Sequence, residues 1–400
     1  MIHVVGGSYL ELCREPHYYE LFGSGLRASL ALASLRARVR FSTFIGSARK
    51  PVLEAKSRGI PIEATEVAET VIFSYLHPLS KPAIEPDNYV RACSQKQREI
   101  VVRAAKVLRF GMVEGSAKVA ARMATYDPQA PSDPRPFGEN GSTAERLAVV
   151  ANKTEAGRLT GEKTPERACK SILREGAEVA VVKCGTDGCV IATSRGIAKV
   201  PAYRTARVWP IGSGDVFTAL FAHGWMELGL QPVQAAERAS RGTSHYVETL
   251  VFPSRSEVDK RGLRPLRRLP ARRHKQVYLA GPFFNLPQRW LIEEFMQALV
   301  GAGVSVFSPL HMVGRGGPEV VYEADMKGLR ECGVILACLD GLDSGTIYEV
   351  GYAHCLGKKV IAFVTAERKE DLKMIIGGKS EMTSDFATAL YLTVWAATCA

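Results

Sequence analysis

The chain has 400 residues, of which 46% are hydrophobic and 23% charged, and its formal net charge is +11. This is the composition of an ordinary globular protein with ample core and two or three domains. No stretch reaches the roughly 20 apolar residues of a membrane span, and the N-terminus lacks the basic segment and cleavage site of a signal peptide, so we expect a cytoplasmic protein. The nine cysteines form no Cys-x-x-Cys pair, which favours reduced thiols over disulfides or a zinc site.

A basic segment divides the chain. From Pro253 to Lys275 it holds nine arginine or lysine residues and two acidic ones, so nine minus two, or +7, of the net charge falls there. We interpret 255–274 as a linker between a first domain, 1–254, and a second domain, 275–400. A patch that attracts phosphate groups is the alternative. Neither flank interleaves basic and aromatic residues, which argues against a nucleic-acid-binding surface.

Strand-like and helix-like runs alternate in the first domain, which predicts an α/β fold with a mainly parallel sheet. The segment Asp127–Thr143 is rich in Pro, Gly, Asp and Ser and is predicted to be a long loop. The expected strands are Val39–Ile45, Val71–Leu76 and Val179–Lys183, and the expected helices are Ser24–Arg36, Asp87–Leu108 and Ser213–Leu228.

The second domain repeats this alternation over a shorter stretch. It predicts a smaller, doubly wound parallel sheet of the Rossmann or flavodoxin-like type. The expected elements in chain order are strand Gln276–Ala280, helix Gln288–Gly301, strand Val304–Phe307, helix Tyr322–Glu331, strand Val334–Leu339, helix Ile347–Leu356 and strand Val360–Val364.

A glycine motif in the first domain suits phosphate chemistry. Ile211-Gly212-Ser213-Gly214-Asp215 begins a long apolar helix. Gly-x-Gly at a helix start exposes backbone N–H groups beside the positive end of the helix dipole, where an anion can bind. A carboxylate directly after it can take the proton of a hydroxyl group that attacks a phosphoryl group.

Three further motifs accompany this one: Gly23-Ser24-Gly25, Asn152-Lys153-Thr154-Glu155, and a strand that ends in the glycine loop 184–188. In this order and spacing, residues 1–255 resemble the PfkB (ribokinase-like) family of carbohydrate and nucleoside kinases. The resemblance implies a ribokinase-like fold, ATP and Mg²⁺ as cofactors, and a sugar or nucleoside as acceptor. The roles it implies are Asp215 as catalytic base, Gly212, Ser213 and Gly214 as anion hole, Asn152 and Glu155 near Mg²⁺ and the phosphates but not as a direct metal site, Gly185 and Gly188 in the ATP site, and Gly23 and Gly25 facing the acceptor.

The chain departs from this family at the expected acceptor site. The family usually has Asp where Trp209 stands, Asn where Ala28 stands, and an early Asp where Glu11 stands. The section between residues 46 and 71 is short and leaves little material for a lid. Two interpretations therefore stay open for the first domain: a kinase, or a non-catalytic module that senses a nucleotide or sugar.

Two carboxylates characterise the second domain. Asp343 follows the apolar strand-like run 334–339, and Glu349 lies in the first turns of the next helix. Open α/β sheets bind their ligands beyond the carboxyl ends of parallel strands. The pair therefore indicates acid–base or nucleophilic chemistry on a sugar, although Asp343 could instead only cap the helix.

With Tyr278-Leu279-Ala280-Gly281-Pro282-Phe283 and Glu323-Ala324-Asp325, this stretch resembles the nucleoside 2-deoxyribosyltransferase family, which includes N-glycoside hydrolases, over residues 275–390. A carboxylate can trap the oxocarbenium-like sugar formed when a C1′–N bond breaks, and a second acid can supply the proton to the leaving base. The resemblance implies a homo-oligomer. The roles it implies are Glu349 as nucleophile, Asp325 and Asp343 orienting it and binding or protonating the base, Tyr278 positioning Glu349, and Gly281, Pro282 and Phe283 lining the nucleoside pocket.

The sequence thus predicts a bifunctional enzyme of nucleoside or nucleotide metabolism with small-molecule partners. One domain would phosphorylate a sugar or nucleoside hydroxyl with ATP, and the other would act at an N-glycosidic bond as a hydrolase or a transferase. The alternative is an N-glycoside hydrolase or transferase whose kinase-like domain only binds its ligand. A protein that binds nucleic acid through the basic segment is a third hypothesis, with steeply salt-dependent binding as its mark.

Overall fold

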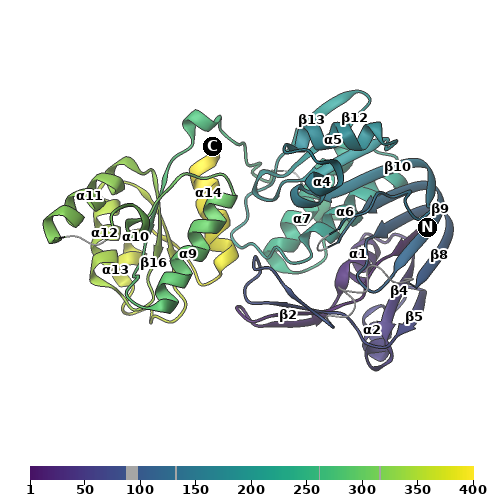
Figure 1. Ribbon diagram of the computed structural model, residues 1–400, viewed down its shortest axis with the longest axis horizontal. Coiled ribbons are helices and arrows are strands. Elements are labelled where there is room, and N and C mark those ends of the chain that lie inside the picture. Colours follow the sequence, from purple (N-terminus) through teal and green to yellow (C-terminus); the bar gives the residue numbers. More distant parts are fainter. Residues whose placement is uncertain (87–97, 131–132, 261, 315–316) are drawn as a thin grey trace. The chain divides into compact units, whose positions relative to one another are not determined.

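The computed structural model describes residues 1–86, 98–130, 133–260, 262–314 and 317–400. The chain forms two compact units, Met1–Pro265 (unit 1) and Leu266–Ala400 (unit 2) (Figure 1). The boundary falls inside the segment that we interpreted as a linker. The first residues of that segment form helix α8 (Arg255–Val258), whose Val258 is fully buried in the core of unit 1.

Unit 1 is built on a nine-stranded sheet with the order β13-β12-β11-β10-β9-β8-β1-β4-β5. Neighbouring strands are parallel except at one edge, where β12 pairs antiparallel with β11 and β13. The strands are β1 (Ile2–Val5), β4 (Val39–Gly46), β5 (Ile62–Val67), β8 (Glu99–Phe110), β9 (Ser116–Asp127), β10 (Thr143–Asn152), β11 (Val179–Lys183), β12 (Cys189–Thr193) and β13 (Gly196–Val200).

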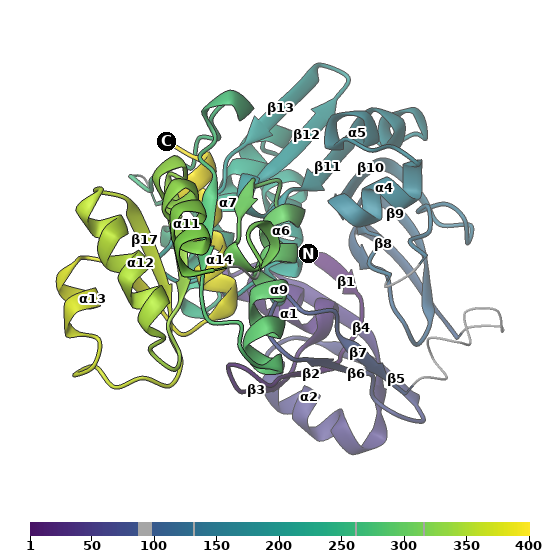
Figure 2. The ribbon, with the colours of Figure 1, turned by 60° about the vertical axis from the view of Figure 1, so that its left-hand side comes forward.

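Helices cover both faces of this sheet, because successive strand residues point to opposite sides. Val150 and Val181 pack into a core with α1, α6 and α7, whereas Val149 and Val182 pack into a second core with α4 and α5. Figure 2 labels these helices around the sheet. The helices are α1 (Gly23–Ser34), α2 (Lys50–Lys56), α4 (Lys153–Thr160), α5 (Pro165–Arg174), α6 (Ser213–Ala222), which continues as a π-helical turn (His223–Glu227), and α7 (Pro232–Thr249).

The expected helix Asp87–Leu108 is wrong over residues 99–108, which lie in strand β8, and residues 87–97 fall outside the described part of the chain. β8 pairs in parallel with β1 on one side and β9 on the other. Its Val102 and Val107 are buried against residues of β9, so sheet pairing overrides the helix-like pattern. The β8–β9 ladder, which runs from Glu99 to Phe110 on β8, skips Ala105.

A second, four-stranded sheet in unit 1 has the order β3-β2-β6-β7. Its strands come from either side of the short section between residues 46 and 71, which itself forms α2 and β5. They are β2 (Leu10–Cys13), β3 (Tyr18–Leu21), β6 (Ile72–Tyr75) and β7 (Ala83–Glu85).

Unit 2 is a five-stranded, all-parallel sheet with the order β15-β14-β16-β17-β18. Numbered within the unit this is 2-1-3-4-5, the flavodoxin-like order. The α/β fold class expected for both parts of the chain is therefore confirmed. The strands are β14 (Val277–Ala280), β15 (Val306–Phe307), β16 (Val334–Cys338), β17 (Lys359–Phe363) and β18 (Glu381–Thr383).

Two layers of helices enclose the sheet of unit 2. α9 and α14 lie on one face and α11 and α12 on the other (Figure 1). The helices are α9 (Leu286–Gly301), α10 (Pro309–Met312), α11 (Pro318–Glu331), α12 (Ser344–Cys355), α13 (Lys373–Gly377) and α14 (Phe386–Thr398). Sequence patterns had not indicated β18 or α14.

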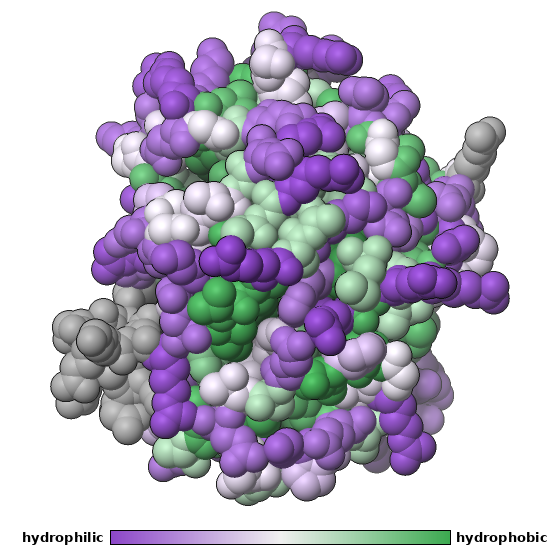
Figure 3. Space-filling view, turned by 90° about the vertical axis from the view of Figure 1, so that its right-hand side faces the viewer, coloured by the Kyte–Doolittle hydropathy of each residue, from purple (hydrophilic) through white to green (hydrophobic). Residues whose placement is uncertain are grey.

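Within the described residues, no helix has both the length and the apolar character needed to cross a membrane. On the face of unit 1 that Figure 3 presents, hydrophobic residues gather in patches among hydrophilic ones.

Candidate active sites

The candidate site of unit 2 lies where the strand order reverses. After β14 the chain turns to β15 on one side and then crosses to β16 on the other. A crevice forms at such a point, outside the carboxyl ends of the first and third strands. Tyr278 comes from β14, and Glu349 from α12, which follows β16. Two residues from separate sequence motifs thus meet at the expected edge of the sheet.

Tyr278 and Glu349 are in direct contact. The Tyr278 hydroxyl donates a hydrogen bond to Oε1 of Glu349 over 2.6 Å. The tyrosine is fully buried, and its ring stacks on Phe307 with the ring centroids 5.3 Å apart. Because the ring cannot move freely, its hydroxyl fixes the position of the carboxylate. The structure therefore brings together the predicted nucleophile and its predicted positioning residue.

Burial changes the acidity of the carboxyl groups near this contact. It raises the pKa of Glu349 to about 7, and the neighbouring Asp325 and Asp343 carboxylates add to the increase, whereas the hydrogen bond from Tyr278 opposes it. Burial also raises the pKa of Asp325 to about 6. Among the described residues, Oδ1 of Asp325 is buried without a hydrogen-bond partner. An unsatisfied buried oxygen of this kind is suited to a ligand.

Asp343 acts as the N-cap of α12. Its Oδ2 accepts hydrogen bonds from the backbone N and from Oγ1 of Thr346, each over 2.8 Å. The structure thus shows the capping contact that the sequence left as an alternative. Because α12 carries Glu349, this cap also sets the direction of the helix that presents the nucleophile.

The turn after β14 is closely packed. A Cβ atom on Gly281 would lie 2.7 Å from Cδ1 of Ile292 and 3.0 Å from Cβ of Cys338, so packing against α9 and β16 is enough to require glycine there. Pro282 is buried, and Phe283 is partly buried with its ring stacked on Phe284. The last two residues remain candidates for lining a nucleoside pocket.

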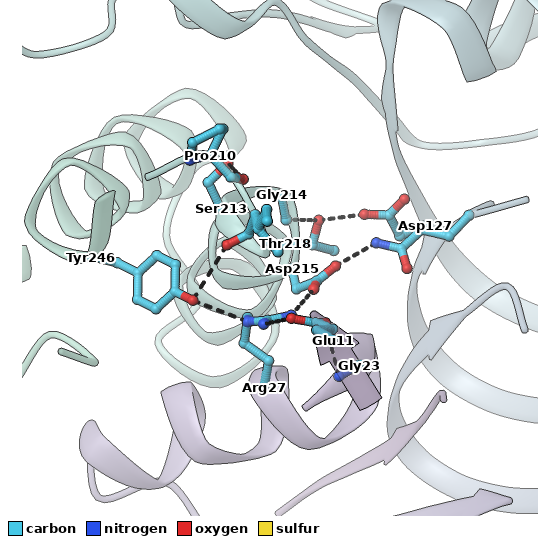
Figure 4. A network of polar contacts seen from close by, with 12 residues as sticks. Glu11, Gly23, Arg27, Asp127, Pro210, Ser213, Gly214, Asp215, Thr218 and Tyr246 are labelled. Carbon is cyan, nitrogen blue, oxygen red and sulfur yellow. Dashed lines mark hydrogen bonds and ion pairs between the residues drawn. The ribbon is translucent and has the colours of Figure 1, made fainter. Parts of the chain in front are cut away.

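The candidate site of unit 1 is centred on Asp215, in the first turn of α6 (Figure 4). Oδ2 of Asp215 accepts a hydrogen bond from Nη1 of Arg27 over 2.9 Å, and Oδ1 accepts one from Nε2 of Gln129 over 2.5 Å. The side chain is only 9% exposed. The predicted base is therefore engaged on both oxygens.

Arg27 links three elements of unit 1 and is 1% exposed. Besides Asp215 on α6, it donates to both carboxylate oxygens of Glu11 on β2, over 2.9 and 2.5 Å, and to the hydroxyl of Tyr246 on α7 over 3.1 Å. Sequence reasoning missed this residue. The available signal was that Arg27 is the only charged residue in the otherwise uncharged helix α1. Ala28, at the position expected for a sugar-binding residue, lies in the apolar core.

Glycines shape the space around Arg27. Gly212 has φ +75°, and a Cβ there would lie 2.1 Å from Nε of Arg27. Gly23 has φ +70° and donates its backbone N–H to Glu11 over 3.1 Å. A Cβ on Gly25 would instead meet Phe41 and the backbone of Gly6. Arg27 and its partners Glu11, Asp215 and Tyr246, with Gln129, form what we call the arginine cluster. Gly212 and Gly23 therefore border the arginine cluster, whereas Gly25 is required by the packing of α1.

A buried cation lies beside the glycine loop. Nζ of Lys183 is 2.5 Å from Oδ2 of Asp127, which also accepts a hydrogen bond from Thr218 over 2.7 Å. Burial alone lowers the pKa of Lys183, but the carboxylates of Asp127 and Glu155 more than reverse this, so the ammonium stays charged. It lies 3.3 Å from where a Cβ on Gly214 would be. The ammonium therefore lies beside the predicted anion hole, paired with Asp127, and sequence reasoning had not assigned it a role.

The remaining predicted residues of unit 1 border this region. Asn152 and Glu155 form a capping box at the start of α4: Oδ1 of Asn152 accepts from the N of Glu155 over 2.9 Å, and Oε2 of Glu155 accepts from the N of Asn152 over 2.8 Å. Gly185 (φ +59°) and Gly188 (φ +83°) form the turn between β11 and β12. Ser213 donates its hydroxyl to the carbonyl of Pro210 over 2.7 Å.

Comparisons with known proteins agree with both assignments. Residues 137–248 match the model of the pfkB family of carbohydrate kinases, and residues 277–384 match the model of nucleoside 2-deoxyribosyltransferases. The chain thus combines regions of these two families, as the sequence motifs predicted. Gly23, Gly25 and Arg27 precede the first match. Among curated proteins, none matches the chain.

Several solved structures are similar to the chain. A PfkB protein from Polaromonas sp. JS666 is 17% identical, with 64% of this chain and 98% of that one covered and a TM-score of 0.45. A ribokinase from Thermotoga maritima is 17% identical, with 65% and 98% covered and a TM-score of 0.44. An Arabidopsis thaliana ribokinase complexed with ribose and ATP is 17% identical, with 64% and 96% covered and a TM-score of 0.46.

Proposed function

We propose that unit 2 cleaves or exchanges the N-glycosidic bond of a nucleoside or nucleotide, with Glu349 as nucleophile. The observation that carries this proposal is the 2.6 Å hydrogen bond from Tyr278 to Glu349 at the switch point of the parallel sheet. The hydroxyl holds one carboxylate oxygen, which leaves the other for attack on a sugar carbon.

The chemistry proceeds in two steps. In the first, an Oε atom of ionised Glu349 bonds to C1′ while the C1′–N bond breaks and its electron pair leaves with the base. The departing nitrogen needs a proton, and Asp325 is the group we assign to manage it, because its pKa of about 6 allows a protonated fraction near neutral pH. In the second, water or the nitrogen of another base attacks C1′, the C1′–O bond to Glu349 breaks with its electron pair returning to the carboxylate, and Asp325 accepts the proton of the attacking group. Hydrolysis and transfer share every protein group up to that point.

For unit 1 we propose binding of ATP with Mg²⁺ at the start of α6. The backbone N–H groups of the Gly212–Gly214 loop and the ammonium of Lys183 provide positive charge for phosphate oxygens. Glu155 uses Oε2 in its cap, and Oε1 remains for a water bound to Mg²⁺. The residues present therefore fit the metal. Mg²⁺, when bound, would neutralise the charge of the phosphates.

We also expect a homo-oligomer. Large apolar side chains on helices around the candidate site of unit 2 are exposed, among them Leu286, Val320 and Tyr348, at 79%, 68% and 52%. A second copy of the chain could cover them. Light scattering of the purified protein tests this expectation.

The proposal for unit 2 is tested by chromatography of a panel of nucleosides and 5′-nucleotides after incubation with the protein, with and without an added free base. Wild type is compared with Glu349→Ala and with Glu323→Ala, which removes an exposed carboxylate of α11. We expect base release or exchange by wild type and by the Glu323 variant, and a loss of at least about a thousandfold in Glu349→Ala. Equal rates in all three proteins would rule out Glu349.

A further inference from the structure

The hydrogen bonds of Asp215 bear on whether it can act as a general base in unit 1. A general base must have an oxygen within hydrogen-bond reach of the hydroxyl that it deprotonates. Both oxygens of Asp215 already accept hydrogen bonds, from Arg27 over 2.9 Å and from Gln129 over 2.5 Å. An incoming hydroxyl would donate its proton to the same oxygens. Each of these oxygens has a second lone pair, so whether a hydroxyl can reach Asp215 depends on the space beside it.

Glu11 is occupied in the same way. One oxygen accepts from the backbone of Gly23 and from Nη1 of Arg27, and the other from Nη2 of Arg27. A single guanidinium thus donates to two carboxylates that come from β2 and α6, 204 residues apart in sequence (215 minus 11). This is the pattern of donors that a polyhydroxylated ligand would offer to the same two groups.

The groups around Arg27 are closely packed. Arg27 is 1% exposed, and its Nε lies so close to Gly212 that a methyl group could not fit between them. A cavity of about 420 Å³ in unit 1 lies instead at the ends of β8 and β9, and of the arginine cluster only Gln129 lines it within the described part of the chain. The guanidinium therefore occupies the space between Glu11 and Asp215.

We propose that Arg27 is a built-in substitute for the acceptor: its guanidinium occupies the acceptor position between Glu11 and Asp215, so that unit 1 binds nucleotide without phosphorylating a hydroxyl group. Asp215 then has a structural role: through Arg27 it links α6 to α1 and to the four-stranded sheet that contains β2. Arg27 is the residue that determines this outcome. The inference rests on the proposed nucleotide site at the start of α6 and goes beyond it, because it assigns a binding function in place of a transfer reaction.

The first test measures ADP release by the full chain from MgATP with a panel of pentoses, hexoses, polyols and nucleosides. We expect no acceptor-dependent release above the rate without acceptor, in wild type and in Asp215→Asn alike. Acceptor-dependent release by wild type that falls tenfold or more in Asp215→Asn would overturn the proposal. Calorimetry with MgATP is run in parallel: failure to bind would contradict the proposed nucleotide site, whereas turnover would contradict only the role of Arg27.

The second test replaces the guanidinium from solution. In Arg27→Ala, millimolar guanidinium ion should re-enter the vacated space and raise the melting temperature by about 3 °C or more, whereas wild type and Arg38→Ala, which removes an exposed arginine, should show no rise. Equal responses of the three proteins would contradict an enclosed acceptor-like site. If Arg27→Ala does not fold, Arg27→Gln, which keeps two amide donors, is used in its place.

Discussion

The hydroxyl of Tyr278 lies 2.6 Å from Oε1 of Glu349, so a buried aromatic residue on the first strand of unit 2 holds a carboxylate on the helix after the third strand. The contact does more than position Glu349. A hydrogen bond to the charged form of a carboxylate favours ionisation, and here it opposes the increase in pKa that burial causes. Geometry and acidity at this site are therefore linked through one hydroxyl group.

Tyr278→Phe should separate these two effects. The substitution keeps the ring on Phe307 but removes the hydrogen bond to Glu349. We expect kcat/KM for base release to fall about 10- to 100-fold and the pKa of Glu349 to rise, because the ionised carboxylate loses its donor. The acid limb of the pH profile of kcat/KM should move to higher pH. A lower rate with an unmoved limb would mean that the hydroxyl does not contact Glu349.

The pH dependence of wild-type activity follows from the same carboxylate. Glu349 must be ionised to attack, and its pKa is about 7. Asp325, the assigned proton donor, must be protonated, and its pKa is about 6. Base release should therefore be fastest between about pH 6 and 7 and fall about tenfold per pH unit on either side. A rate profile without a break between pH 5 and 8 would contradict the assignment.

The free energy of unfolding of unit 2 should fall as the pH rises. The pKa of Glu349 is about 7 in the folded chain and 4.5 ordinarily, so the folded state binds the proton more tightly and loses stability as the pH rises from 4.5 through 7. Glu349→Gln lacks this loss. Relative to wild type, the variant should therefore become more stable by about 3 kcal/mol between pH 4.5 and pH 8.

Hydrogen exchange of the β14 and β16 amides in the full chain measures the free energy of unfolding of unit 2 at each pH. Glu323→Gln, at an exposed position of α11, serves as the control and should show no pH-dependent change relative to wild type. A Glu349→Gln variant that tracks wild type across this range would show that the burial of Glu349 does not alter its acidity.

Two glycines allow the packing against Arg27 to be measured. Gly212 and Gly229 both have positive φ, +75° and +65°, but a Cβ on Gly229 would meet nothing within 4 Å. Gly229→Ala should cost about 1 kcal/mol from backbone strain alone, and Gly212→Ala about 3 kcal/mol, because the methyl group also displaces the guanidinium. Thermal unfolding compares them. Equal costs would mean that Arg27 does not pack on the glycine loop.

The sequence predicted the site of unit 2 more completely than that of unit 1, for a physical reason. Tyr278 lies on the first strand of unit 2 and Glu349 on the helix after the third strand, and these two strands are neighbours in the sheet. Parallel strands align their carboxyl ends, so the meeting of two such motifs can be inferred without coordinates. Arg27, Gln129 and Asp215 come from a helix, a loop and another helix. Their contacts depend on how distant segments pack, and no local pattern encodes them.

Local patterns also failed where sheet pairing decides the structure. Residues 99–108 have the composition of an amphipathic helix, yet β8 is paired on both sides, with β1 and β9. Of the small sheet of unit 1, the sequence indicated only β6, as Val71–Leu76, because the other strands are three or four residues long. In both cases long-range hydrogen bonding between strands outweighs local preference.

The central claim is that Glu349 bonds covalently to the sugar. It is tested most directly by mass spectrometry of acid-quenched, peptic-digested protein after incubation with a 2′-fluorinated nucleoside, whose fluorine slows breakdown of the glycosyl ester. We predict a mass increase equal to the sugar on the peptide that contains Glu349, absent in Glu349→Gln. Release of the base with no adduct on that peptide, or with the adduct on another residue, would contradict the account.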